Sequence, residues 1–324
     1  MGKTIYILLF LAVYSTQLWS QQIPVFSQYR EYNSYINPAS VNSDYFTYEY
    51  NLSLGVSHRR QWYNLPDGPR DIFLRGEYII DSKGKFNLIT GGYLMKDEIQ
   101  PISSTGIYGR LGVIMAEDPY LGGISIGFTF GGVQYMVDAN KIEFLQTESN
   151  IADFSKSKIV PAVGIGIAYF KQIQKGTLKG DNIYAGISMP QLLELDIEFK
   201  DAQNAYALDR VRHVFLTGGY YKYINESSYI EPSIWYKYAP NAPGNLTFSL
   251  RYHYANVFWI GTGYDTGGSL HIEAGINIGP ARAGKSNFKI GYGFDTGVAN
   301  KISNFGSSHE VNLSYNFDTR KPKI

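Results

Sequence analysis

The chain has 324 residues, with 29 Lys and Arg against 28 Asp and Glu, and a formal net charge of +1. This balance gives no electrostatic reason to expect a nucleic acid as partner. The absence of Cys excludes disulfides, thiolate metal sites and a lipid anchor on an N-terminal Cys. The abundance of Gly (34 residues) and Tyr (28 residues) leaves two classes to separate, a secreted β-sandwich and an outer-membrane β-barrel.

Residues 1–20 have the pattern of a secretory signal peptide. Lys3 gives a basic start, residues 5–13 form an apolar core, and Ser20 is a small residue at a plausible cleavage point. The core is too short to cross a bilayer as a helix. We therefore expect the chain to leave the cytoplasm and to lose this segment.

Residues 21–43 precede the first predicted strand and carry Phe26, Tyr29, Tyr32 and Tyr35, which a solvated tail would normally lack. Two prolines disfavour a regular strand. If the following strands close into a barrel, we expect this segment to pack in the lumen or across the periplasmic mouth. The alternative is a loose leader that only reaches the assembly machinery.

The remainder, residues 44–324, alternates apolar and polar residues with the period of a β-strand. In "EVNLSYNFD", for example, Val311, Leu313 and Tyr315 alternate with polar residues. About fourteen strands are predicted near 44–57, 70–80, 86–95, 104–116, 120–133, 159–170, 182–189, 211–223, 227–238, 245–253, 256–265, 269–278, 286–296 and 308–318. Their lengths suit tilted membrane-spanning strands better than the shorter strands of a sandwich.

The connections follow the alternation of short periplasmic turns and long outer loops that membrane barrels show. Residues 81–85 and 117–119 are short turns on the inner side, whereas 134–158 and 190–210 are long stretches on the outer side. The inner connection 171–181 is long and the outer connection 266–268 is short, so these two depart from the pattern. The sequence predicts an all-β fold, a transmembrane antiparallel outer-membrane β-barrel of about 14 strands.

Residues that could carry chemistry are few. The "GISIG" pattern around Ser125 resembles a hydrolase motif, but that motif requires a strand-to-helix turn, whereas Ser125 lies within an alternating strand. The five His residues show no metal-binding spacing. We expect no catalytic residue, no metal and no cofactor, and therefore no enzyme.

Charged residues on the inward faces form a more informative set. They comprise Arg75, Glu77, Arg251, Glu273, Lys289 and Asp295. Their near-balance of sign favours a structural network across the lumen over an ion-selective pore, although an open water-filled channel can also carry such charges.

Four stretches resemble the PorP/SprF family of type IX secretion system membrane proteins. The first includes Gln21, Gln22, Pro24, Phe26, Ser27, Gln28, Tyr29, Asn37, Pro38 and Ala39. The second is "RRQWYNLP", with Arg60, Gln61 and Trp62. The third is "YAGISMPQLL" (184–193), and the fourth comprises the closing strands (291–317). The motif residues from Pro24 to Pro38 and from Arg60 to Trp62 are candidates for docking a partner.

The resemblance implies an outer-membrane barrel of a Gram-negative, Bacteroidota-like cell. It also implies partners: outer-membrane lipid, periplasmic components of the secretion system, and one large exported protein, often an adhesin, whose secretion or surface attachment the barrel assists. Two rivals remain, a passive channel or hydrophobic-solute transporter and, less favoured, a membrane-embedded enzyme.

Overall fold

The computed structural model describes residues 26–82, 84–138, 155–175, 178–200, 205–279, 286–298 and 305–320. The expected signal peptide and Pro24 lie outside these residues. Fourteen antiparallel strands form a closed barrel in which β1 pairs with β16, and β8 and β9 form a separate two-stranded sheet. The predicted fold class is confirmed.

The barrel strands are β1 (Leu52–Arg60), β2 (Arg70–Ile80), β3 (Phe86–Ile99), β4 (Ile102–Met115), β5 (Gly122–Asp138), β6 (Ser155–Lys175), β7 (Leu178–Gln191), β10 (His213–Tyr223), β11 (Tyr229–Tyr238), β12 (Asn245–Tyr254), β13 (Phe258–Asp265), β14 (Ser269–Ile278), β15 (Ser286–Gly297) and β16 (Ser308–Phe317). The additional hairpin is β8 (Leu195–Lys200) and β9 (Ala205–Arg210). Three short helices precede β1: η1 (Tyr29–Tyr32), α2 (Asn33–Ile36) and α3 (Ser43–Tyr48).

The first strand begins later than the sequence predicted. Residues 43–48 form α3, whose N-terminus is capped by the Asn42 side chain, which accepts a hydrogen bond from Asp44 N at 2.9 Å. Glu49 ends the helix in the left-handed conformation, with φ 61°. The alternating aromatics of this stretch resemble a strand, but the cap fixes a helix, so β1 starts at Leu52.

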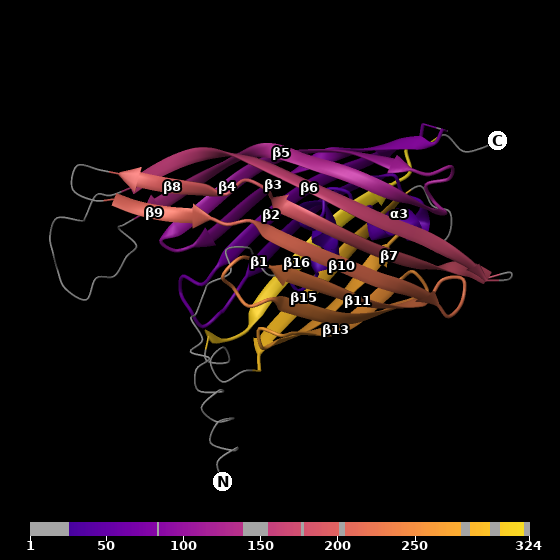
Figure 1. Ribbon diagram of the computed structural model, residues 1–324. Helices are drawn as coiled ribbons and strands as arrows, with labels where there is room; N and C mark the ends of the chain where they lie inside the picture. Colours follow the sequence, from indigo (N-terminus) through magenta and orange to yellow (C-terminus); the bar gives the residue numbers. More distant parts are fainter. Residues whose placement is uncertain are drawn as a thin grey trace, which may run out of the picture.

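A second difference lies at the short-turn end of the barrel, where the expected inner connection 171–181 lies mostly within β6 and β7, which leaves only 176–177 between them. A third lies at the opposite end, where β5, β6 and the hairpin project together (Figure 1). Within the expected loop 190–210, β8 and β9 pack on the extended strands through the buried cluster Val133, Val137, Val160, Ala162, Ile197 and Phe199. Apolar burial therefore orders part of what alternation alone marked as loop.

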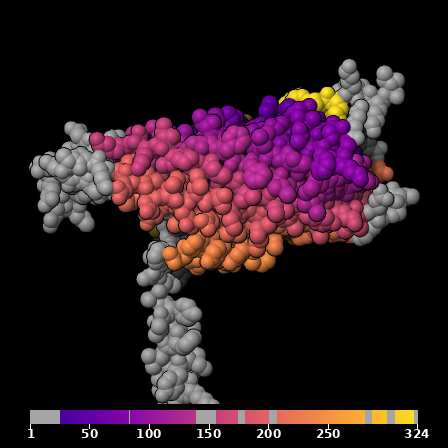
Figure 2. Space-filling view, turned by 45° about the horizontal axis from the view of Figure 1, so that its top comes forward, coloured from indigo at the N-terminus to yellow at the C-terminus, as the bar shows by residue number. Residues whose placement is uncertain are grey.

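Successive residues of the strands point alternately outward and into the lumen, as expected. Val311 and Tyr315 on β16 are each 43% exposed, whereas Asn312 and Asn316, the residues that directly follow them, are buried. Figure 2 shows one side of the resulting wall as a continuous, elongated surface. No helix among the described residues is long and apolar enough to cross a membrane.

The segment before β1 lies inside the barrel, where its helices appear in indigo, enclosed by the strands (Figure 1). Near its start, Ser27 contacts Asp295 and Glu310, next to the long connections. Near its end, the Tyr48 hydroxyl contacts Asn256 and Asn277, next to the short turns, at 3.2 and 3.3 Å. The segment therefore runs along the length of the lumen. We refer to residues 26–48 as the plug.

Candidate functional site: the plugged lumen

The plug is anchored first by its aromatic side chains. Phe26, Tyr29, Tyr32 and Tyr35 are each at most 5% exposed. Phe26 stacks on Tyr32 with a centroid distance of 3.7 Å, and Tyr32 in turn contacts Phe73 of β2. The remaining two aromatics contact other parts of the wall, Tyr29 at Trp235 and Tyr35 at Tyr93. Burial of such large rings is a major source of packing energy, so the wall provides the surface that these rings need.

Two adjacent charged residues of the plug, Arg30 and Glu31, pair with opposite charges on the wall. Arg30 donates to Glu231 on β11 at 2.7 Å and to Glu273 on β14 at 3.4 Å. Glu31 lies 3.1 Å from Arg75 on β2 and 3.3 Å from Lys289 on β15. Arg251 on β12 lies 3.9 Å from Glu31 and binds Glu273 at 2.5 Å. The two residues therefore link five strands around the lumen.

The electrostatics of Glu31 show how strongly this site holds a negative charge. Burial alone raises the pKa of a carboxyl group. Here Lys289, Arg75 and Arg251 outweigh that effect and lower the pKa of Glu31 from its usual 4.5 to about 2. Glu31 is therefore ionised at neutral pH, although it is only 4% exposed.

A second ion cluster and an extension of the Glu31 network hold the two ends of the plug. At the start of the plug, Arg59 binds Asp295 at 2.5 Å and Glu310 at 3.4 Å, and its guanidinium also donates to Ser27 Oγ at 2.6 Å. At its end, Lys289 binds Asp44 of α3 at 3.1 Å.

The Asn37–Pro38 pair rests on three inward-facing glycines, one on each of three neighbouring strands. A Cβ at Gly127 on β5 would overlap the Pro38 carbonyl, and a Cβ at Gly166 on β6 or Gly186 on β7 would overlap the Asn37 side chain. These glycines therefore allow the plug backbone to approach the wall closely. They include glycines of the "GISIG" and "YAGISMPQLL" stretches.

The wall also satisfies the carbonyl groups that this irregular backbone leaves without partners. Ser188 Oγ donates to Ile36 O at 2.6 Å, Arg110 Nε to Pro38 O at 2.7 Å, and Ser125 Oγ to Ala39 O at 2.6 Å. Buried carbonyl groups need such partners. Ser125 thus holds the plug backbone and lies within β5, not on the exposed turn that a hydrolase nucleophile requires.

Five of the six charged residues expected in the lumen belong to one ion network with Glu31 of the plug, in which Arg75 also binds Glu77 at 3.4 Å. The sixth, Asp295, belongs to the Arg59 cluster at the start of the plug. Sequence reasoning did not assign Arg59, Arg110, Glu231, Glu310 and Asp44 to the lumen network. Strand alternation could have placed the first four on inward faces, whereas Asp44 was hidden because its segment was predicted as a strand.

The candidate docking residues separate into two places. Phe26, Ser27, Gln28, Tyr29, Asn37 and Pro38 lie in the lumen and are buried. Arg60 ends β1, and Gln61 and Trp62 follow it in the connection to β2, where the Trp62 ring contacts Phe305 at 5.1 Å. The latter group is at the end of the barrel with the long connections.

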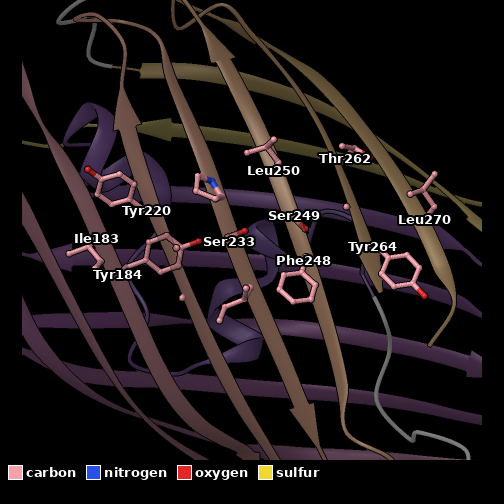
Figure 3. A pocket seen from close by; sticks show the side chains of 15 residues that line it. Ile183, Tyr184, Tyr220, Ser233, Phe248, Ser249, Leu250, Thr262, Tyr264 and Leu270 are labelled. Atoms are coloured by element: carbon pink, nitrogen blue, oxygen red, sulfur yellow. The ribbon is translucent and has the colours of Figure 1, made fainter. Parts of the chain in front are cut away.

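An apolar hollow of about 700 Å³ lies across the outward face of β7 and β10–β14 (Figure 3). Phe248, Leu250 and Tyr264 border it. The Ser233 and Thr262 hydroxyls at its base are already bonded, Ser233 to Tyr29 OH at 2.5 Å and Thr262 to His271 O at 3.0 Å. Both hydroxyls therefore already have partners within the protein. In the described part of the chain, no group of three or more His, Cys, Asp or Glu could hold a metal ion.

A family model described as "Type IX secretion system membrane protein PorP/SprF" matches residues 19–315. The chain belongs to this family. The resemblance stated from the sequence is thereby confirmed, and the protein is a membrane β-barrel of a secretion-system family. No protein of curated function matches the sequence.

Solved structures with a similar fold include the CymD monoaromatic hydrocarbon channel, at 9% identity and a TM-score of 0.53, covering 93% of this chain and 95% of CymD. A TodX deltaS2S3 mutant monoaromatic hydrocarbon channel matches at 12% identity and a TM-score of 0.51, covering 88% and 94% of the two chains. At these identities the likeness concerns the barrel fold alone.

Proposed function

We propose that this PorP/SprF protein is a non-enzymatic outer-membrane barrel that assists the type IX secretion or surface attachment of one large, adhesin-like exported protein. Family membership supports the link to the secretion system. The plugged lumen supports an accessory role. The plugged lumen is the observation that separates an accessory barrel from a pore through which cargo or solutes pass.

The argument from the plug is energetic. An open lumen would require Arg30 and Glu31 to leave buried partners on five strands, and breaking a buried ion pair costs about 3–5 kcal/mol. It would also expose the aromatic side chains at the start of the plug. A barrel that stays closed at rest acts through its surfaces, namely its connections and its ends.

The exported partner would bind at the end with the long connections. Loops on a rigid barrel can vary without unfolding it, which suits recognition of one partner. The described part of this end includes the β8–β9 hairpin, whose Ile197 and Phe199 are buried against the wall. That packing makes the hairpin a fixed platform for partner contacts. Periplasmic secretion components would meet the opposite end.

The rival is a passive channel or hydrophobic-solute transporter, which shares the barrel. Conductance of the purified protein in planar bilayers separates the two. The accessory barrel should conduct almost no ions, whereas the variant that lacks Gln22–Ser40 should conduct freely.

The function itself is tested by deleting the gene and comparing the surface proteomes of the deletion and complemented strains. We expect one large exported protein to disappear from the deletion strain and to return on complementation. Loss of all type IX substrates would indicate a core component of the machinery, and an unchanged surface proteome would refute the proposal.

A further inference from the structure

The outward face of four neighbouring strands changes from apolar to basic at one level. On β1, the lipid-facing residues Leu54 and Val56 are followed, toward the end with the long connections, by His58 and then Arg60. The same change occurs on β2, β3 and β16, where outward apolar residues give way to Arg70, Lys96 and His309. We call these five residues, His58, Arg60, Arg70, Lys96 and His309, the basic rim. Since apolar side chains face the lipid tails, the basic rim lies at the level of the headgroups.

Two arginines at the centre of the basic rim are direct neighbours. Arg60 on β1 is the register partner of Arg70 on β2. Like charges directly opposite one another destabilise a sheet unless an anion compensates them. Arg70 is also the register partner of Glu98 on β3, but the Glu98 carboxylate is paired with Lys96 at 2.5 Å, and among the described residues neither guanidinium has an ion pair within 4 Å.

The connection between β1 and β2 fixes the two arginines. Gln61 N donates to Pro69 O at 2.8 Å, and Tyr63 N donates to Ser307 O at 2.7 Å. The Pro66 carbonyl accepts from Arg60 at 3.5 Å and from Arg70 at 3.3 Å. A guanidinium carries five N–H donors, so most donors of both arginines are left for another acceptor.

An aromatic side chain completes the site. The Tyr63 ring is 56% exposed and lies 4.5 Å from the Arg60 guanidinium carbon. Tyrosines at a membrane interface place the ring near the acyl chains and the hydroxyl in water. The arrangement therefore offers two planar cationic forks at the surface of the lipid layer.

We infer that Arg60 and Arg70 bind a phosphate group of an outer-leaflet glycolipid of the lipid A type. Guanidinium groups bind phosphate through paired hydrogen bonds, and a phosphate between the two arginines would also remove their repulsion. The site lies at the end with the long connections, which face the cell exterior in such barrels. The inference rests on the outer-membrane location in the proposed function, but it is independent of any exported partner.

The test uses the full mature chain in detergent and native mass spectrometry with bisphosphorylated lipid A. Arg60→Gln/Arg70→Gln should weaken binding by about tenfold or more, as expected when charge-assisted hydrogen bonds are lost. The matched control, Lys85→Gln/Lys171→Gln, removes two exposed positive charges at the short-turn end, one in the β2–β3 turn and one on β6, and should leave binding unchanged. Heat-modifiability on gels checks that both double variants are folded.

Binding measurements with two other lipids identify which group of the ligand is bound. Dephosphorylated lipid A should bind wild type and Arg60→Gln/Arg70→Gln equally weakly, and phosphatidylglycerol should bind wild type less tightly than lipid A. Equal lipid A binding by wild type and Arg60→Gln/Arg70→Gln would overturn the site, as would an equal loss in the control. Phosphatidylglycerol binding as tight as that of lipid A would overturn the assignment to a glycolipid. A normal lipid result together with an unchanged surface proteome on gene deletion would refute the proposed function alone.

Discussion

Replacing Glu31 by Gln isolates the electrostatic contribution of the plug, because Gln has nearly the same shape. The fall in the pKa of Glu31 from 4.5 to about 2 corresponds to about 3 kcal/mol of stability at neutral pH. Breaking a buried ion pair gives a similar range of about 3–5 kcal/mol. We therefore expect Glu31→Gln to lower the free energy of unfolding by roughly 3 kcal/mol, because Lys289, Arg75 and Arg251 lose a common counter-ion.

The pH dependence follows from the direction of the shift. A carboxyl group whose pKa is lower in the folded state stabilises the protein above its unfolded pKa and loses this effect as the pH falls toward its folded pKa. The difference between wild type and Glu31→Gln should therefore be constant above about pH 5 and shrink between about pH 4.5 and pH 2.

Urea unfolding of the barrel in detergent, followed by tryptophan fluorescence at several pH values, measures this difference. The matched control is Glu98→Gln, which removes a carboxylate from an exposed pair with Lys96 and should cost less than about 1 kcal/mol. A Glu31→Gln variant as stable as the Glu98→Gln variant at pH 7 would refute the view that the ion network holds the plug.

The remaining predictions concern packing, facing and position. Gly127→Ala should increase ion conductance by displacing the plug, whereas Gly132→Ala on the same strand should not, since its Cβ would lie 3.8 Å from the nearest atom. Leu313→Arg, on the lipid-facing side of β16, should cost about 2–4 kcal/mol in unfolding assays if it lies near mid-bilayer, and a negligible cost would contradict the assigned facing. A Cβ at Gly293 would lie 2.9 Å from that of Ser27, which is closer than the roughly 3.5–4.5 Å of a disulfide, so Ser27→Cys/Gly293→Cys should form a disulfide detectable by gel shift after a small displacement of the plug, in a chain without other Cys. Failure of that pair to oxidise would argue against the described path of the plug.

The barrel could be predicted because its signal is local and repeated. Alternation along residues such as Val311 and Leu313 fixes which face is apolar, and strand length fixes a membrane-spanning architecture. The charged lumen residues could be predicted for the same reason. Alternation states which face a residue occupies, and Arg75 and Glu273 could be assigned inward without knowledge of their partners.

Alternation could not predict the contact partners of the lumen residues or the irregular elements before β1. The helix α3 depends on the Asn42 cap, which competes with a strand-like aromatic pattern. The role of Gly127 depends on the path of a backbone that is 89 residues away at Pro38, which no periodicity records. Alternation placed Lys289 in a lumen network, but its partners Glu31 and Asp44, both in the segment before β1, could not be read from it.

The position of the plug also bears on how the barrel closes. Closure depends on pairing between β1 and β16, the first and last strands. Arg59 on β1 binds Asp295 on β15 and Glu310 on β16, and Ser27 of the plug donates its backbone N–H to Glu310 at 2.9 Å. The start of the plug therefore completes an ion cluster that spans the closing seam. Because Glu310 is fully buried, it depends on these donors, and a barrel without the plug should open first between β1 and β16.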